Sequence, residues 1–582
     1  MRLKIIQIII YCSVLFVLFL AACEDSPEPK SQENQIIQND KNDDARLLSL
    51  TIAGKAVALG APGATLAEAV AAELKLRFEE ASDISPVIVT KSGKAGAVYG
   101  KMKHGEPEPV LVKSGAIDLE NGDYFVVRVK AEDDSVLYYI VAVTVSKPLG
   151  PFQSKYLTFS DEIPVMRINT EGGAAIRGTS DSDYVNAVIS IENSKQSNIN
   201  NWAVTIRGRG NSTWGMPKKP YRIRGVSRNN LFGRERVRNW ALLANYADKS
   251  LMRNYVAFLL GRSLSSDYIS NVIFTELYLN GSYDGLYCLQ DHQESGPSRV
   301  NVEGFTKDAS GNLVDVGFML ELDMIDRNPG AVRDRDYFSI SDRSTLSGRY
   351  FFLKYPKYDD DGFEDPAFFR QALNYIKDTV AAVHTAIDTG DMAAFENLCD
   401  KDSFLNYILV NEWMKNVDGA QLSMFFNKKM GGKFKMGPLW DFDLSSGDTH
   451  YPEYGINDLY YPENWWIVNK YSGSNIPWFR SLIRVNSFYE EFRARYLELY
   501  ETNIQHTIDS IDVIRELIRP AALRNFNRWQ ILNSTWYWPQ SPPVLAIHTW
   551  DGQIDYLKDY LTKRSAWMYD QLYNRKAIPG VR

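Results

Sequence analysis

Three aspartates in the C-terminal half of the chain are the residues best suited to chemistry. Asp441 and Asp443 directly follow an apolar run, residues 437–440, and Asp418 lies a short way upstream. Carboxylates gathered at one point repel each other and raise each other's pKa unless a cation lies between them. Mg²⁺ prefers one or two carboxylates together with phosphate oxygens and water. The pattern therefore predicts a site for Mg²⁺ and a nucleotide.

A helix and a hairpin must bring these aspartates together. Apolar residues at helical spacing predict a helix over residues 403–416. Two strand-like runs come next, residues 422–426 and 434–440, with a glycine turn between them, and they predict an antiparallel hairpin. The first strand then starts beside the end of the second, so Asp418 and Asp441 should be neighbours in space.

The same order of elements occurs in protein kinases: a helix, a loop with a catalytic Asp, a hairpin, and a metal-binding Asp. In that scheme Asp418 accepts or orients the proton of the acceptor hydroxyl, and Asp441 holds Mg²⁺. Asp443 is a second metal ligand or orients the loop, and Asn416 or Asn427 assists. The alternative is that these are turn residues capping helices, which explains Asp418 equally well because Asp before Gly favours a turn. The His-Arg-Asp triplet and the Gly-x-Gly-x-x-Gly loop of ordinary kinases are absent from the sequence.

A glycine-rich basic segment, residues 206–222, is the second part of the predicted site. Its glycines would let the backbone approach a phosphate, and a lysine on the adjoining strand would neutralise the charge. Lys218 and Lys219 point to opposite faces of that strand, so only one can face the site. The predicted nucleotide-binding residues are Arg207, Asn211, Lys218, Lys219 and Arg253. A glycine-rich turn beside a solvated basic strand is the alternative, and for Arg253 a surface ion pair.

Taken in order, these segments resemble the CotH kinase family of atypical, secreted kinase-like proteins. The matching pieces lie between about residues 156 and 500 and are Arg207-Gly208-x-Gly210-Asn211-Ser212, Pro217-Lys218-Lys219-x-Tyr221, Leu243-x-Asn245-x-x-Asp248-x-Ser250-x-x-Arg253-Asn254, Glu276-Leu277-Tyr278-Leu279-Asn280-Gly281-x-Tyr283-x-Gly285-Leu286-Tyr287, Asn416-x-Asp418 and Gly437-Pro438-x-Trp440-Asp441-Phe442-Asp443. The resemblance implies a distorted kinase-like fold, ATP and Mg²⁺ as cofactors, and transfer of phosphate to a protein substrate. By position, Asp418 resembles the catalytic aspartate and Asp441 the metal-binding one.

The chain departs from the family at two places. Where the family often has a Glu that pairs with the lysine, this chain has Asp291, whose side chain is shorter. Where the family often has Phe-Gly-Asn after the metal aspartate, this chain has Ser446-Gly447-Asp448. These departures leave open a non-catalytic, pseudokinase scaffold or a lipoprotein that binds a glycan or a protein.

Two further alternatives rest on residue types. Trp465, Trp466 and the aromatic run 536–538 would either stack on sugars or pack the C-terminal core. A glycosidase would also use paired carboxylates. A basic strand facing the aspartates separates phosphate transfer from glycoside hydrolysis, because only the former needs positive charge there.

The N-terminus predicts export and anchoring. Residues 1–23 combine two positive charges, a short apolar run and small residues before a cysteine, which is typical of a signal peptide. The end of this segment resembles the lipobox of bacterial lipoproteins, so Cys23 would carry a lipid and bind a membrane. A plain signal peptide or short anchor is the alternative. Residues 24–45 are polar and predict a flexible tether. The expected location is the cell envelope, at the outer membrane or the cell surface.

Composition limits the other possibilities. The chain has 582 residues, which predicts two or three domains. Its net charge is −7 and no Lys/Arg block stands out, which argues against a nucleic-acid partner. Of the cysteines expected in the folded part, Cys288 and Cys399 would form a disulfide or remain separate thiols.

The predicted fold class is α+β. Residues 46–147 contain short β-branched and aromatic runs that predict a small, all-β, Ig-like sandwich, although residues 65–78 read as helical. Residues 155–575 form the predicted CotH kinase-like domain, with strands first. Helices should dominate from Asp365 onward, because Asp365 and Pro366 are typical of the cap and first position of a helix.

Overall fold

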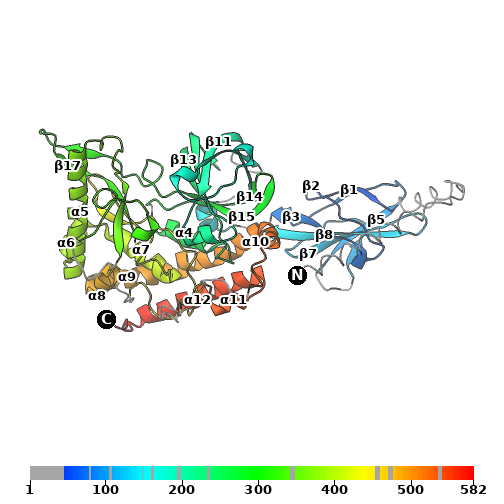
Figure 1. Ribbon diagram of the computed structural model, residues 1–582. Helices are drawn as coiled ribbons and strands as arrows, with labels where there is room; N and C mark the ends of the chain where they lie inside the picture. The colour runs from blue at the N-terminus through cyan, green and yellow to red at the C-terminus, as the bar shows by residue number, and fades with distance from the viewer. Residues whose placement is uncertain are drawn as a thin grey trace, which may run out of the picture. The chain divides into compact units, whose positions relative to one another are not determined.

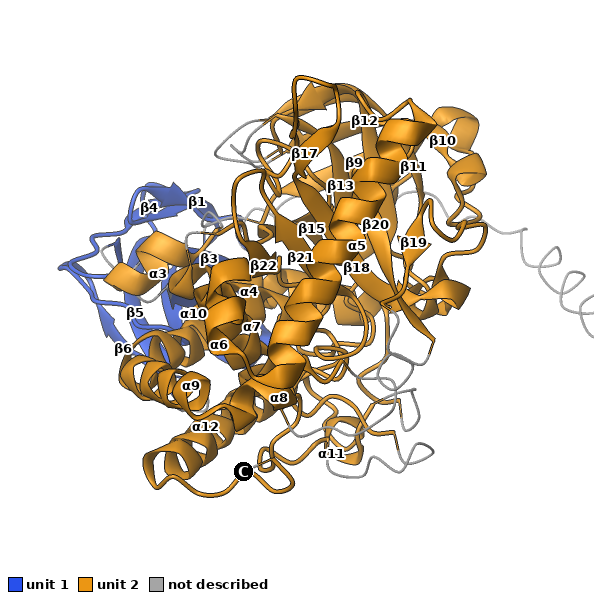
Figure 2. Cartoon of the chain, turned by 90° about the vertical axis from the view of Figure 1, so that its left-hand side faces the viewer, with its two compact units in different colours: residues 1–148 blue, residues 149–582 orange. Residues whose placement is uncertain are grey.

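The structure, a computed structural model, divides the chain into two compact units, residues 1–148 and 149–582 (Figure 2). It describes residues 45–581 except 78–79, 104–105, 107, 147–148, 159–162, 193–197, 232–235, 266, 341–347, 452–458, 469–475 and 535–539. The predicted signal peptide, its lipidated Cys23 and residues 24–44 of the predicted tether lie outside the described part.

The first unit consists of two sheets around one core. The smaller sheet has the order β2 (Lys55–Ala56), β1 (Leu47–Ile52) and β4 (Val87–Thr90). The larger has the order β3 (Ala72–Arg77), β8 (Val136–Ser146), β7 (Asp123–Lys130), β5 (Gly96–Lys103) and β6 (Val110–Val112). The core is made by inward residues of both sheets, since side chains alternate along a strand.

The predicted helix over residues 65–78 is wrong. Only a 3₁₀ turn forms, Leu66–Glu68, and the chain then continues as β3, which pairs in parallel with β8. The reason is visible in the burial of β3, where Ala72, Leu74 and Leu76 face the core. That period of two suits a strand and cannot form one face of a helix.

The second unit begins with a short helix, α3 (Pro151–Tyr156), and a closed β-barrel (Figure 1). The barrel order is β10 (Val185–Glu192), β11 (Ile199–Gly208), β12 (Tyr221–Asn229), β13 (Val237–Leu243), β15 (Ser282–Asp291), β14 (Val272–Leu279) and β9 (Val165–Thr170). Strands β14 and β15 pair antiparallel as a hairpin around Asn280. Helix α4 (Arg253–Leu264) lies between β13 and β14 in the chain.

A five-stranded sheet comes after the barrel. Its order is β19 (Tyr337–Phe338), β20 (Arg349–Tyr355), β18 (Phe318–Met324), β21 (Met424–Lys428) and β22 (Phe434–Met436). The ribbon of β16 (Phe305–Lys307) and β17 (Leu313–Val316) precedes it. The predicted hairpin is confirmed: β21 and β22 pair antiparallel, with Phe426 opposite Met436 and Lys428 opposite Phe434.

The C-terminal part is helical, as predicted. Helix α5 starts at Pro366, and the Asp365 side chain caps it by accepting the N–H of Ala367 at 2.9 Å. The remaining helices are α5 (Pro366–Thr389), α6 (Met392–Leu398), α7 (Lys401–Met414), α8 (Trp478–Arg484), α9 (Asn486–Leu499), the π-helical turn Tyr500–Ile504, α10 (Gln505–Arg528), α11 (Pro542–Leu545) and α12 (Trp550–Tyr573). Within the described ranges, none of the helices is both long enough and apolar enough to cross a membrane.

An aromatic cluster fixes the hairpin to the helices. The Trp478 ring of α8 lies 5.5 Å from that of Phe426 and 6.1 Å from that of Phe434, centroid to centroid. The Phe404 ring of α7 lies 6.4 Å from Trp478. Aromatic pairs at such separations stabilise the fold beyond the contribution of their buried area.

The two cysteines of the described part, Cys288 and Cys399, are both buried and free, so the disulfide alternative is excluded.

Helix α7 is held at its C-terminal end by a buried ion pair. The Glu412 carboxylate of α7 accepts from Arg564 of α12 at 2.5 Å, and both side chains are fully buried. Glu412 also accepts the backbone N–H groups of Trp466 at 2.7 Å and Val468 at 3.1 Å. Because every carboxylate oxygen has a donor, the charge is satisfied only while Arg564 and this loop remain in place.

We predict that Arg564→Met lowers the free energy of unfolding by about 3–5 kcal/mol, because it leaves the Glu412 charge buried without its partner. Adding Glu412→Gln should cost less than the sum of the two single changes. Urea denaturation followed by circular dichroism measures both.

The matched control is Lys563→Met, one residue away in the chain. Lys563 pairs with Asp559 on the exposed side of α12, and losing such a pair should cost no more than about 0.5 kcal/mol. A loss below about 1 kcal/mol for Arg564→Met would contradict the prediction.

Candidate active site

One large cavity, of about 1070 Å³, is lined from the barrel and the five-stranded sheet of the second unit. The barrel contributes the loop after β11 and residues 243–247 after β13, while β18 and β20 contribute from the five-stranded sheet. All three predicted acidic residues, Asp418, Asp441 and Asp443, line this cavity. The hairpin therefore brings Asp418 to a pair of carboxylates that lie well beyond it in the sequence.

Phe442, which lies between Asp441 and Asp443, explains why both aspartates face the cavity. Phe442 is fully buried, and its ring lies 5.9 Å from that of Phe258 of α4. Its N–H donates to the side chain of Asn254 at 2.8 Å. Asp441 has a left-handed backbone with φ of 66°, uncommon for a residue other than glycine. With Phe442 held in the core, both flanking aspartates face the cavity.

The two carboxyl groups lie within hydrogen-bonding distance of each other. Burial raises the pKa of Asp443 well above its usual range, and the charges of Asp441, Asp248 and Asp448 add to this shift. Two carboxyl groups so close share a proton or a cation. Burial and the neighbouring charges thus disfavour a bare Asp443 carboxylate, which is the electrostatic character of a cation site.

The donor set fits Mg²⁺ bound to phosphate better than a metal held by protein alone. Across the described ranges, no group of three or more His, Cys, Asp or Glu side chains is arranged to hold a metal ion. Mg²⁺ needs only one or two carboxylates when phosphate oxygens and water complete its shell. Asp441 and Asp443 can supply that pair.

Asp418 lies in a turn just after α7. Its carbonyl oxygen accepts from the N–H groups of Gln421 at 2.9 Å and Leu422 at 3.1 Å, and its carboxylate accepts from the Gln421 amide at 3.2 Å. The two asparagines predicted to assist do not line the cavity. Asn416 is buried and accepts the N–H of Asp418 at 3.3 Å, whereas Asn427 donates to the carbonyl of Gly437 at 2.9 Å. They shape the loop and the hairpin.

Among the described residues, three cations that the sequence did not predict line the cavity, namely Arg209, Arg327 and Arg349, and Arg209 is the one coupled to Asp441 and Asp443. It lines the cavity, and its guanidinium group lies 5.4 Å from the ring centroid of Trp440. Burial lowers the pKa of Arg209, and the charges of Asp441 and Asp443 oppose that shift. The side chain is therefore electrostatically coupled to both carboxylates. Its place in the same glycine-rich segment as Arg207 and Asn211 made it a candidate of equal standing with Arg207.

Arg207, predicted to bind the nucleotide, does not reach the cavity. Its guanidinium group donates to the carbonyl oxygens of Thr179 and Gly208, and it lies 3.4 Å from the carboxylate of Asp181. It also lies over the Tyr184 ring, at 5.1 Å. The strand β11 ends at Gly208, and the turn there sends Arg207 and Arg209 to different surroundings.

Arg253, also predicted to bind the nucleotide, is part of a buried structural network. It contacts Asp248 at 2.5 Å, Asp448 at 3.5 Å and the carbonyl of Ser445 at 3.0 Å, and it does not line the cavity. The surface ion-pair alternative fails too, because Arg253 is fully buried. It connects the start of α4 to the segment that comes after Asp443.

The two lysines face opposite ways, as predicted, although both precede β12, which begins at Tyr221. Lys218 is buried and lines the cavity; its ammonium group donates to the carbonyls of Ala244 (2.8 Å) and Leu286 (2.5 Å) and to the Asn525 side chain (2.8 Å). Burial lowers the pKa of Lys218 to about 7.

Lys219 points elsewhere and donates to the carbonyl of Trp214 at 2.6 Å. Asp291, at the family's glutamate position, is not the partner of either lysine. It lies 3.1 Å from Arg299 and accepts from the Tyr268 hydroxyl at 2.9 Å.

The loop glycines serve the packing of the loop itself. Gly210 has a φ of +81°, and a Cβ there would lie 2.0 Å from the hydroxyl of Thr213. At Gly208 a Cβ would lie 2.4 Å from the Trp214 ring. Packing within the loop is thus enough to require glycine at both positions, and close approach of a phosphate there stays a prediction.

A second acidic group faces the same cavity from β18. Glu321 pairs with Lys354 at 2.7 Å, and Asp323 lies 3.5 Å from Arg327. Burial raises the pKa of Asp323 to about 7, with further upward contributions from Glu321 and Asp418 and a downward one from Arg327. The alternation of apolar and acidic residues along β18 is the sequence signal that could have indicated them.

Comparison with known proteins gives one positive result. The sequence model of the family described as CotH kinase protein matches residues 206–568, more than half of the chain and including every residue that lines the cavity. No curated protein matches the chain. Membership in this family suggests kinase-like phosphate transfer with nucleotide and metal dependence in general terms. The chain belongs to the CotH kinase family.

Proposed function

We propose that the second unit transfers a phosphoryl group from ATP, bound with Mg²⁺, to a hydroxyl group of a protein substrate. One observation carries the proposal: Asp418, the pair Asp441 and Asp443, and the cation Arg209 all line one cavity. Phosphoryl transfer requires positioning and charge stabilisation, with an aspartate at the acceptor and a metal at the phosphates. Positive charge coupled to the aspartates favours this chemistry over glycoside hydrolysis, which has no use for it.

The surroundings of each residue in the cavity determine the role that we propose for it. Asp441 and Asp443 would hold Mg²⁺, which when bound neutralises charge on the phosphate oxygens. Arg209, stacked on Trp440, would donate to those oxygens, because its fork of N–H groups suits a phosphate. Asp418, oriented by the Gln421 amide, would accept the proton of the acceptor hydroxyl.

Lys218 would have a structural role. A lysine ammonium group has three donors, and the protein already supplies three acceptors at 2.5–2.8 Å. A phosphate would have to displace one of them. We therefore assign phosphate contact to Arg209 and not to the lysine of the family motif.

The setting of the reaction rests on sequence features. We propose that Cys23 is lipidated and anchors the protein at the cell envelope, outer membrane or surface, after removal of the signal peptide. The two sheets of the first unit are proposed to be an Ig-like spacer, and the barrel, sheet and helices of the second a distorted kinase-like fold. Nucleic acid is not the proposed partner.

The second candidate is a non-catalytic scaffold. Two observations favour it: the donors of Lys218 are all used, and Asp291 is bound to Arg299 away from the cavity. In that case the surface would bind a partner without transferring phosphate. Sugar stacking by Trp465 and Trp466 receives no support, because both rings are buried; residues 536–538 lie outside the described part.

We predict that Asp441→Asn weakens the affinity for ATP in the presence of Mg²⁺ by about 10–100-fold, because it removes one metal ligand. Isothermal titration with and without Mg²⁺ measures this change. The matched control is Asp509→Asn on the exposed face of α10, which should bind like the unchanged protein. If the unchanged protein shows no Mg²⁺-dependent binding of ATP, the scaffold is the better interpretation.

Asp418→Asn should separate catalysis from binding. Because Asp418 would act on the acceptor and not on the metal, ATP binding should be retained while the rate of phosphate transfer falls about 10²–10⁴-fold. Transfer to envelope proteins with radiolabelled ATP measures the rate. Loss of ATP binding in this variant would instead place Asp418 among the metal ligands.

Arg209 and Lys218 should differ in what they affect. Arg209→Ala should raise the KM for ATP about tenfold or more, at unchanged thermal stability, since it removes a charge-assisted hydrogen bond to phosphate. Lys218→Met should mainly lower the melting temperature, because it removes three buried hydrogen bonds. The reverse pattern would return phosphate contact to the lysine.

A further inference from the structure

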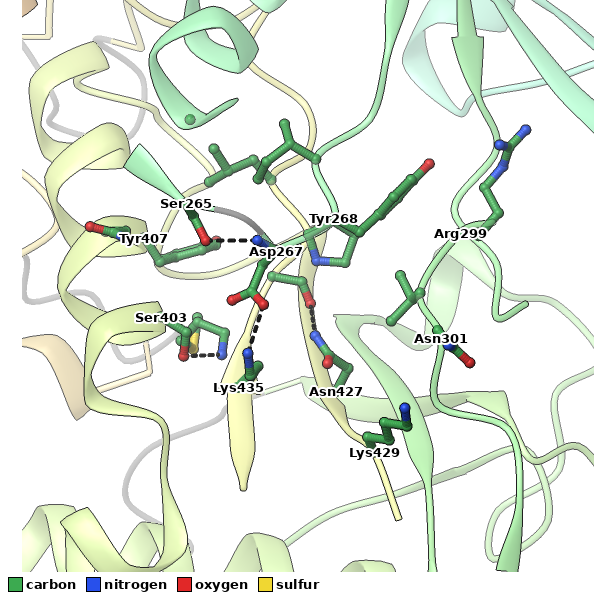
Figure 3. Close-up of a pocket in the computed structure, with 18 of the residues that line it drawn as sticks. Ser265, Asp267, Tyr268, Arg299, Asn301, Ser403, Tyr407, Asn427, Lys429 and Lys435 are labelled. Atoms are coloured by element: carbon green, nitrogen blue, oxygen red, sulfur yellow. Dashed lines mark hydrogen bonds and ion pairs between the residues drawn. The ribbon is translucent and has the colours of Figure 1, made fainter. Parts of the chain in front are cut away.

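A second cavity, of about 450 Å³, is lined by the β21–β22 hairpin itself (Figure 3). Among the described residues it shares no lining residue with the cavity that holds the aspartates. Its charge is one-sided, since the only carboxylate among its described lining residues is that of Asp267. The cationic residues of the lining are Arg299, Lys429, Lys433 and Lys435.

Two of these cations are neutralised within the protein. Lys435 lies 2.6 Å from Asp267 and 3.2 Å from Asp400, so its charge is fully compensated. Arg299 is buried and lies 3.1 Å from Asp291. Neither has charge to spare for a ligand.

The other two form no ion pair with a described residue, although the Glu396 carboxylate lies close enough to Lys433 for their charges to interact. Lys433 is exposed and, among the described residues, donates only to the neutral carbonyl of Glu396. Lys429 is exposed as well, and within the described part of the chain its ammonium group has no hydrogen-bond or ion-pair partner. Both belong to the turn of the hairpin, between the paired residues Lys428 and Phe434, and both line the cavity.

Amide groups adjoin these charges, and an apolar wall lies behind them. Figure 3 shows Lys429 directed toward the space between Asn427 and Asn301. Asn427 uses one N–H on the carbonyl of Gly437 and retains the other. Buried apolar side chains form the wall; they are Tyr407, Val410, Met436 and Leu439.

We propose that this cavity binds a phosphate monoester whose organic part is small and apolar. Two ammonium groups that form no ion pair with a described residue, beside amide donors, suit a dianion, whereas a carboxylate would be balanced by one lysine. The apolar wall would take the organic part, and the volume is within the range of small-ligand sites. A phosphorylated protein side chain and a free small phosphate ester share this chemistry. The proposal does not depend on the proposed function of the larger cavity.

The position of the site adds weight to it. The Tyr407 hydroxyl donates to the carbonyl of Gly419, next to Asp418, at 3.3 Å. Gly437 and Leu439 line the cavity and lead directly into Asp441. A ligand here would therefore contact both segments that carry the acidic residues of the larger cavity.

The test is calorimetric titration of the full chain, without nucleotide, with phenyl phosphate. We expect one saturable site, with affinity reduced about tenfold or more in the double variant Lys429→Ala, Lys433→Ala. Lys563→Ala, an exposed lysine on α12, should bind unchanged. Inorganic phosphate should bind more weakly than phenyl phosphate, because it leaves the apolar wall unused. A phosphoserine peptide is titrated in parallel. Tighter binding of the peptide would identify a phosphorylated protein side chain as the ligand, and tighter binding of phenyl phosphate would identify a free small phosphate ester.

Two results would overturn the proposal. One is the absence of saturable binding by either ester. The other is binding that survives in the double variant or is lost in Arg209→Ala, which would place the anion in the larger cavity. Both lysines are exposed, so the double variant should remain folded, and its thermal unfolding curve checks this.

Discussion

The arrangement of the acidic residues depends on the burial of one aromatic ring. Phe442 enters the core against Phe258 of α4, and Asn254 from the same helix holds its backbone N–H. Burial of such a side chain is worth about 1.5–3 kcal/mol, and it outweighs the unusual backbone of Asp441. Two carboxylates are thereby forced to face one another, although their repulsion opposes it. A bound cation would reduce that repulsion, so the way the chain folds here favours binding of a metal ion.

Two buried groups of charged residues hold the segments that carry the acidic residues in place. Arg253 joins the start of α4 to the segment after Asp443 through carboxylates and carbonyls. Further back, Glu412 and Arg564 lock α7 to α12. These buried charges contribute rigidity to the loop carrying Asp418, since each is satisfied in one arrangement only. Residues that look like ligands in the sequence can therefore be the framework of a site.

Elements that depend on neighbouring residues could be predicted from the sequence. The antiparallel hairpin, the cap at Asp365 and the helical C-terminal part result from periodicity and turn residues, and the structure confirms them. Contacts between distant segments could not be predicted. Nothing local distinguishes Arg207 from Arg209, yet the end of β11 sends only Arg209 to the cavity. The strand β3 is a different case, because its alternation of apolar and charged residues is a local signal of a strand, which the prediction of a helix there overlooked.

Lys218 has a mechanical consequence. Its ammonium group joins three stretches of chain: the segment after β13, strand β15 and helix α10. Separating the barrel from α10 would break the bond from Lys218 to Asn525, and a hydrogen bond to a charged group contributes about 1.5–3 kcal/mol. This bond favours movement of the barrel and α10 as one body, so β18 and β20, which line the other side of the cavity, are the elements freer to move when a bulky substrate enters.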